Sequence, residues 1–298
     1  MKQFVLKHRR LLLYILYGVL ITPVILLVRF PSEAIRDYLQ SRINSKGLGI
    51  QVDIQDASLS FPAAIRLTAV KCSLRENPDE IVFAAEQVSV RPGLLSLFGK
   101  KPRYGFICQA YGGSISGNID LQKNGKDASV RLSTEFKGIH IDDKSKLPSI
   151  IKECISGDLK GYLTYSGESL SDLSGTGNAS LALSDGSIKF EKPLMNINSI
   201  DFKESVIKAD LEDQNLNISE IDFRGRDFIG EATGIIALKS PVEKSLINLK
   251  GTIEPTDSFI KALEKSGGTG LILKQSLKNG KLPFAFNGTI ENFHFRLM

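Results

Sequence analysis

The chain has 298 residues and a formal net charge of +5, and all of that charge lies in residues 1–30, which hold five basic residues and no Asp or Glu. The other 33 of the 38 basic residues balance the 33 acidic ones, so the sequence pI of about 8.9 does not indicate a nucleic-acid-binding surface. Trp is absent, Gly is common, and Val, Ile, Phe and Thr recur in short alternating runs, which is typical of an extended β protein.

One uncharged stretch near the N-terminus is long enough to cross a bilayer. It begins at Leu11, ends at Val28 and reads LLLYILYGVLITPVILLV. As a helix, residues 11–28 would span about 27 Å, close to the thickness of the hydrocarbon core. Lys-His-Arg-Arg precedes the stretch and a single basic residue, Arg29, follows it. This bias predicts a cytoplasmic tail at residues 1–10, a membrane anchor at 11–28, and the rest of the chain across the membrane.

Two other interpretations of this stretch fit less well. A cleaved signal peptide has a shorter apolar region, about 7–15 residues, and a small-residue cleavage site, whereas residues 28–31 read Val-Arg-Phe-Pro. A buried core helix would not begin with an abrupt change from basic to apolar residues. Pro23 would give a modest kink, which membrane helices tolerate. We therefore expect an uncleaved anchor.

A juxtamembrane segment at residues 29–48 is predicted to contain a helix from about residue 32 to 45. Ser32 can cap this helix, and Glu33 suits the positive end of its dipole. Apolar residues at helical spacing form one face: Ile35, Tyr38, Leu39 and Ile43. That face either packs against the first strands, which we favour, or lies on the membrane or plugs one end of the β domain.

Residues 49–298 are predicted to form a β-rich domain of about thirteen to fifteen short strands. Apolar and polar residues alternate with period two, and Asn124-Gly125 and Asp185-Gly186 suit hairpin turns, so we expect antiparallel, half-buried strands. The expected strands are residues 50–54, 58–61, 65–74, 81–90, 103–111, 115–122, 129–136, 159–165, 177–183, 188–190, 200–211, 216–223, 228–238, 246–253 and 282–297. Short helices or a loop plug are expected at residues 94–98, 147–155 and 256–263.

The predicted helices are too few to cover the apolar side of such a sheet. Either the sheet folds on itself, or its apolar face forms a groove that something else fills. Glycines in the middle of predicted strands, at positions 117, 161, 251 and 288, are typical of a sheet that bends. The fold class we expect is mostly β: a transmembrane helix followed by a long, strongly curved antiparallel sheet, shaped like a groove, with a few short helices.

Residue patterns typical of catalysis or metal binding are missing from the sequence. His140 and His294 have no partners at triad spacing, and the acidic pairs at 142–143 and 212–213 suit solvated turns. The glycine-rich residues 267–270 lack the Lys and Ser/Thr of a phosphate-binding loop. We therefore expect a non-enzyme with no catalytic, cofactor-binding or metal-ligating residues, and with no cofactor.

The three cysteines, Cys72, Cys108 and Cys154, show no metal-ligand spacing. In an oxidising compartment Cys72 and Cys108 could pair, which leaves one thiol free. The simpler interpretation is that the cysteines are small buried apolar residues.

The order of several weak motifs over nearly the full length resembles the type II secretion system protein N family in its long, single-anchor form. After the basic N-terminus and anchor come FPSE at 30–33, SFP at 60–62, YGGSISG at 111–117, LSDGSI at 183–188, GTIEP at 251–255 and LPFAFNGTI at 282–290. The resemblance implies a single-pass protein of the bacterial inner membrane with a periplasmic β domain, which is associated with type II protein secretion and contacts other secretion-system proteins.

A more distant resemblance to AsmA-like envelope proteins implies a different function. It implies an apolar β-groove that binds or transfers lipid. The secretion hypothesis predicts a self-filled β core with protein contacts at strand edges or through the anchor, whereas the lipid hypothesis predicts an open apolar groove. An enzyme acting on envelope glycan or lipid would need a polar cluster in a cleft, for which the strands offer no candidate.

Overall fold

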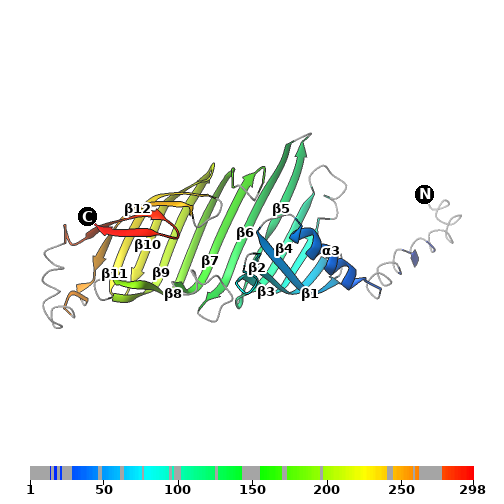
Figure 1. Cartoon of the computed structure of the whole chain (residues 1–298), viewed down its shortest axis with the longest axis horizontal. Coiled ribbons are helices and arrows are strands. Elements are labelled where there is room, and N and C mark those ends of the chain that lie inside the picture. Colours follow the sequence, from blue (N-terminus) through cyan, green and yellow to red (C-terminus); the bar gives the residue numbers. More distant parts are fainter. Residues whose placement is uncertain are drawn as a thin grey trace, which may run out of the picture.

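A computed structural model describes residues 14, 17–18, 21, 29–45, 49–60, 64–75, 77–93, 96, 102–124, 127–142, 155–169, 173–194, 197–239, 244–257, 259–261 and 277–298. Within these residues the chain forms one helix of several turns, α3, and one sheet whose fourteen strands lie in the order of the sequence. Figure 1 shows the strands side by side along the long axis, with α3 beside β1 at one end and the C-terminus at the other.

The helix is α3 (Ser32–Asn44). The strands are β1 (Ile50–Ser60), β2 (Ala64–Leu74), β3 (Ile81–Pro92), β4 (Arg103–Ala110), β5 (Gly113–Asn124), β6 (Asp127–Ile141), β7 (Ile155–Gly167), β8 (Thr176–Leu194), β9 (Ile197–Glu212), β10 (Asn215–Gly225), β11 (Phe228–Ala237), β12 (Leu246–Pro255), β13 (Leu282–Thr289) and β14 (Phe293–Leu297).

The prediction of a mostly β, antiparallel fold is confirmed. Every described pairing is antiparallel and joins strands that follow each other in the chain. The first and last strands each have one partner strand among the described residues, so the sheet is open. The predicted hairpin around Asn124 is also present, since Asn124 pairs with Asp127 at the end of β5 and β6.

The predicted hairpin at Asp185-Gly186 is wrong, because β8 runs through it as one strand. Asp185 has a φ of 49°, and the register of β8 against β7 slips by one residue between the pairs Ser156–Ser187 and Asp158–Ser184. The two residues therefore form a β-bulge, in which a single left-handed residue bends the strand without reversing it. Similarly, the break predicted between residues 54 and 58 is absent from β1.

The last predicted strand, residues 282–297, is instead a hairpin. Thr289 and Asn292 donate backbone hydrogen bonds to each other's carbonyl oxygens, at 3.2 and 3.1 Å, and the chain reverses between them. Because residues 290–292 read Ile-Glu-Asn, no Gly or Pro dipeptide marks this turn in the sequence. The reversal creates β14, which is the outermost strand of the sheet.

Helix α3 matches its prediction except in two details. Its N-cap is Pro31, and the Ser32 hydroxyl donates to the Phe30 carbonyl at 3.4 Å, so the predicted Ser32 cap is wrong. The helix begins one residue too early for that cap, because the Ile35 amide already donates to the Pro31 carbonyl. Tyr38 is 66% exposed and lies away from the sheet.

The predicted anchor lies mostly outside the described residues. Only positions 14, 17, 18 and 21 of residues 11–28 are described, and all four are helical. Among the described residues, no helix has the length and apolar character needed to cross a membrane. The predicted elements at 94–98 and 147–155 also lie almost entirely outside the described residues, whereas residues 257 and 259–261 are helical as expected.

Candidate functional site: an apolar sheet face

The register of the sheet joins uncharged residues of all fourteen strands into one row, and every member except Thr134 is apolar or glycine. Each member of the row pairs with the next across neighbouring strands: Leu59, Ile65, Val90, Phe106, Gly117, Thr134, Leu163, Ala179, Ala209, Ile218, Gly234, Leu249, Phe286 and Phe295. No member is charged. We call the side of the sheet that contains this row the apolar face.

The opposite side of the sheet, the polar face, has a contrasting row. Its paired positions include Arg66, Ser89, Ile107, Ser116, Glu135, Tyr162, Ser180 and Lys208. Along β7 the residues of the polar face are mostly exposed, and those of the apolar face are buried or half-buried. Because side chains alternate along a strand, each strand presents one kind of residue to each side.

The apolar face is long for a surface that has a single layer. Thirteen strand spacings of about 4.8 Å give a length of roughly 62 Å. A soluble monomer usually exposes apolar patches of only a few hundred Å². In the described part of the chain, α3 is the one helix of several turns, and it packs on β1, so no described layer covers the middle strands.

Both ends of the apolar face are covered. At the N-terminal end, Leu39 and Ile43 of α3 pack against a core whose buried members are Val52, Ile54, Val70, Ala85, Cys108 and Ala110. At the C-terminal end, Ile260 and Leu282 are buried beside Phe259, whose ring lies 4.5 Å from that of Phe228. The uncovered part of the apolar face therefore lies between these two clusters.

Helix α3 also covers the free edge of β1. The Asn44 side-chain amide donates to the Val52 carbonyl at 3.2 Å, and its oxygen accepts from the Val52 amide at 2.8 Å. The Gln40 side chain donates to Asp53, and Arg75, the residue after β2, donates to the Asn44 carbonyl. The exposed backbone of an edge strand invites pairing with other chains, and these contacts occupy that edge at Val52.

Glycines on the apolar face lie beneath aromatic rings. A Cβ at Gly117 would lie 2.0 Å from the Ser133 carbonyl oxygen and 2.9 Å from the Phe106 ring. A Cβ at Gly186 would lie 2.6 Å from the Phe202 ring, and a Cβ at Gly251 would lie 2.7 Å from the Phe284 ring. These positions therefore have room for an aromatic side chain from the neighbouring strand only because they lack a side chain of their own.

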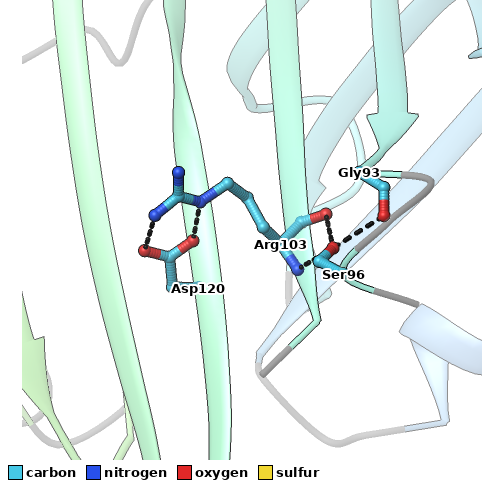
Figure 2. A network of polar contacts seen from close by, with 4 residues as sticks. All are labelled: Gly93, Ser96, Arg103 and Asp120. Carbon is cyan, nitrogen blue, oxygen red and sulfur yellow. Dashed lines mark hydrogen bonds and ion pairs between the residues drawn. The ribbon is translucent and has the colours of Figure 1, made fainter. Parts of the chain in front are cut away.

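The polar face is held by exposed ion pairs and by a network at the β3–β4 connection, shown in Figure 2. Arg103 binds Asp120 with two hydrogen bonds of 2.6 and 3.0 Å, which lower the pKa of the Asp120 carboxyl. The Ser96 hydroxyl donates to the Gly93 carbonyl at 2.7 Å and accepts from the Arg103 amide at 2.9 Å. This network fixes where the connection leaves and re-enters the sheet.

His140 is the histidine of the sheet that has close acidic partners. Its Nδ1 lies 2.7 Å from Asp158 and its Nε2 lies 3.8 Å from Asp142, and the hydrogen bond to Asp158 raises the pKa of His140. Both ring nitrogens therefore lie toward carboxylates. The sequence does not reveal this pair, because the β6–β7 register brings together residues that lie eighteen positions apart.

Cys72 and Cys108 are free thiols within the N-terminal core. They lie on β2 and β4, two strand spacings or roughly 9.6 Å apart, which is beyond the reach of a disulfide. Burial raises the pKa of the Cys108 thiol to about 11. The interpretation as small buried residues is therefore confirmed for Cys108, whereas Cys72 is half-buried against the same core. Cys154 lies outside the described residues.

Two hollows, of about 380 and 640 Å³, are lined chiefly by residues of the polar face. The first lies over β3–β6, and the second lies over β10–β13 beside Met298. Neither contains a histidine or a cysteine, and the described residues include no cluster of His, Cys, Asp and Glu that could hold a metal ion.

Comparison with known proteins gives no match, whether to a protein-family model, to a curated protein or to a solved structure.

Proposed function

We propose that the chain is a non-enzymatic, membrane-anchored envelope protein that binds lipid acyl chains along the apolar face of its sheet. The observation that supports this proposal is the row of fourteen paired positions without a charged residue. Acyl chains need an extended apolar surface and few directional polar contacts, and this face offers both.

The glycines of the apolar face support the further proposal that the sheet curves into a groove. Gly161, Gly234 and Gly288 have φ values of 147°, 154° and 130°, which other residues rarely adopt. Such glycines are a known means of bending a sheet. A sheet that bends toward its apolar face would shield bound acyl chains from water.

The proposed anchor at residues 11–28 gives the groove a direction. Because α3 follows this segment and packs on β1, the β1 end of the sheet would lie nearest the membrane. The apolar face would then extend away from the inner membrane into the periplasm. This arrangement suits a protein that holds lipid between membranes.

Native mass spectrometry of the full chain in detergent tests this proposal. We expect a stoichiometric phospholipid adduct on the wild type. Leu163 and Tyr162 are neighbours on opposite faces of β7, and Tyr162 is 51% exposed. The substitution Leu163→Glu should reduce the adduct at least tenfold, since it places a carboxylate on the apolar face. Tyr162→Glu is the matched control and should leave the adduct unchanged. Equal adducts on both variants, or none on the wild type, would contradict the proposal.

A role in type II secretion is the second candidate, supported by the family resemblance and by one structural feature. The outer edge of β14 has no partner strand among the described residues, and a component of a protein assembly can use such an edge. Loss of secretion with normal envelope permeability after deletion would favour this candidate. A permeability defect with intact secretion would favour lipid handling.

A further inference from the structure

The two edges of the sheet are treated differently. At β1, the outward-facing amide and carbonyl of Val52 are both bonded by the Asn44 side chain. At β14, no described strand or helix covers the outer edge, and Phe293 is 55% exposed. Natural sheets usually protect such edges, so an unprotected one indicates a docking surface.

The hydrogen bonds between β14 and β13 show which backbone atoms of β14 face away from the sheet. The Met298 amide donates to the Pro283 carbonyl at 2.8 Å, so residue 298 directs its amide toward β13. Because this direction alternates along an antiparallel strand, residues 293, 295 and 297 direct their backbone amides and carbonyls away from β13. The outer edge of β14 therefore offers three donors and three acceptors in a row.

We infer that the outer edge of β14 binds an extended strand of a different protein, which continues the sheet. Apolar residues of that strand would extend the apolar face beyond Phe293, and carboxylates would face Arg296 and His294, which are exposed on the polar face of β14. This inference rests on the proposed function, since the apolar face is what the added strand would prolong.

A second copy of the chain does not fit this edge. Asn44 already bonds the outward-facing amide and carbonyl of Val52, so β14 of a second copy could not pair along the whole of β1. The pairing of two copies that remains is through β14 and β14. If the β14 strands of two copies pair antiparallel, the two copies are related by a twofold axis perpendicular to the sheet. The second sheet then runs from its β14 edge in the opposite direction to the first. Two sheets of roughly 62 Å would then place the proposed anchors on opposite sides, roughly 120 Å apart. Two copies in one membrane cannot meet in this way.

Fluorescence anisotropy of labelled peptides tests the inference on the full chain in detergent micelles. The probes are a nine-residue peptide of alternating Val and Glu, and its counterpart of Val and Lys. Phe295→Pro removes one outward-facing amide without removing a bond to β13, and edge strands tolerate such a proline. Phe295→Ala is the matched control, since it retains the amide.

We expect the Val–Glu peptide to bind the wild type and Phe295→Ala, and to bind Phe295→Pro at least tenfold more weakly. Arg296→Glu should reverse the preference in favour of the Val–Lys peptide.

Absence of binding, absence of a preference on the wild type, or equal binding to the two variants at 295 would overturn the inference. A wild-type dimer that Phe295→Pro dissociates would overturn the choice of a different protein. Peptide binding without a lipid adduct would contradict the proposed function alone, and the reverse result would contradict this inference alone.

Discussion

At the scale of single residues, glycines decide how closely neighbouring strands and their side chains approach on the apolar face. Gly117 and Gly105 lie on adjacent strands, but a Cβ at Gly105 would meet nothing closer than 3.5 Å. At Gly117 the first obstacle is a backbone carbonyl at 2.0 Å, which cannot move aside without a change in the strand. A substitution at Gly117 therefore reports a steric clash together with the general effect of replacing glycine, whereas one at Gly105 reports the general effect alone.

We predict that Gly117→Ala lowers the free energy of unfolding by about 1–3 kcal/mol, because it overpacks a filled site. Gly105→Ala should change it by no more than about 0.5–1 kcal/mol. Urea denaturation followed by circular dichroism measures both variants. Equal losses of unfolding free energy at the two positions would show that the close approach of the Ser133 carbonyl and the Phe106 ring to Gly117 is unimportant.

The Cys108 thiol predicts a specific loss of stability at alkaline pH. Its pKa is raised to about 11 in the folded chain, from the ordinary value of 9.0, so above pH 9 the unfolded chain loses this proton first. Unfolding then becomes more favourable by about 1.4 kcal/mol per pH unit up to pH 11. Cys108→Ala lacks this thiol and should have a flatter profile of unfolding free energy between pH 9 and pH 11. Parallel profiles for wild type and variant would contradict the assignment.

At the scale of elements, the sequence predicted strands well and their connections less well. Alternation places β5 and β6, because it depends only on neighbouring residues. Asn124-Gly125 lies between these two alternating runs, which favours a hairpin turn there. Asp185-Gly186 suits both a hairpin turn and a bulge, and the choice depends on whether β7 and β9 pair on both sides of it. The turn before β14 carries no signal, because its hydrogen bonds come from backbone groups and a threonine hydroxyl.

One side chain of α3, Asn44, makes both hydrogen bonds to the backbone of Val52, which gives a testable variant. Asn44→Ala removes two hydrogen bonds to Val52, so we predict a loss of about 1–3 kcal/mol in the free energy of unfolding. The uncovered edge should also cause self-association that increases with concentration. Ser41→Ala, on the exposed side of α3, is the control. Urea denaturation and analytical ultracentrifugation give the two readouts, and a monomeric Asn44→Ala variant of normal stability would contradict this role.

At the scale of the whole molecule, the sequence indicated an apolar side to the sheet but not its continuity. A pattern of period two shows that each strand has an apolar side, and it cannot show that fourteen such sides align. Alignment is a property of the register, which bulges adjust in β6, β8 and β10. The difference between the two edges of the sheet also could not be predicted from the sequence, because Asn44 and Val52 meet only after α3 folds back onto β1.

Photo-crosslinking in cells tests the central claim, that lipid lies along the apolar face, most directly. A benzophenone amino acid would be placed at three adjacent pairs of residues, one member on each face: Ile65 and Arg66, Tyr162 and Leu163, and Leu249 and Lys250. We predict phospholipid adducts at Ile65, Leu163 and Leu249, and none at their neighbours. Adducts at both members of each pair, or at neither, would contradict a lipid-binding apolar face.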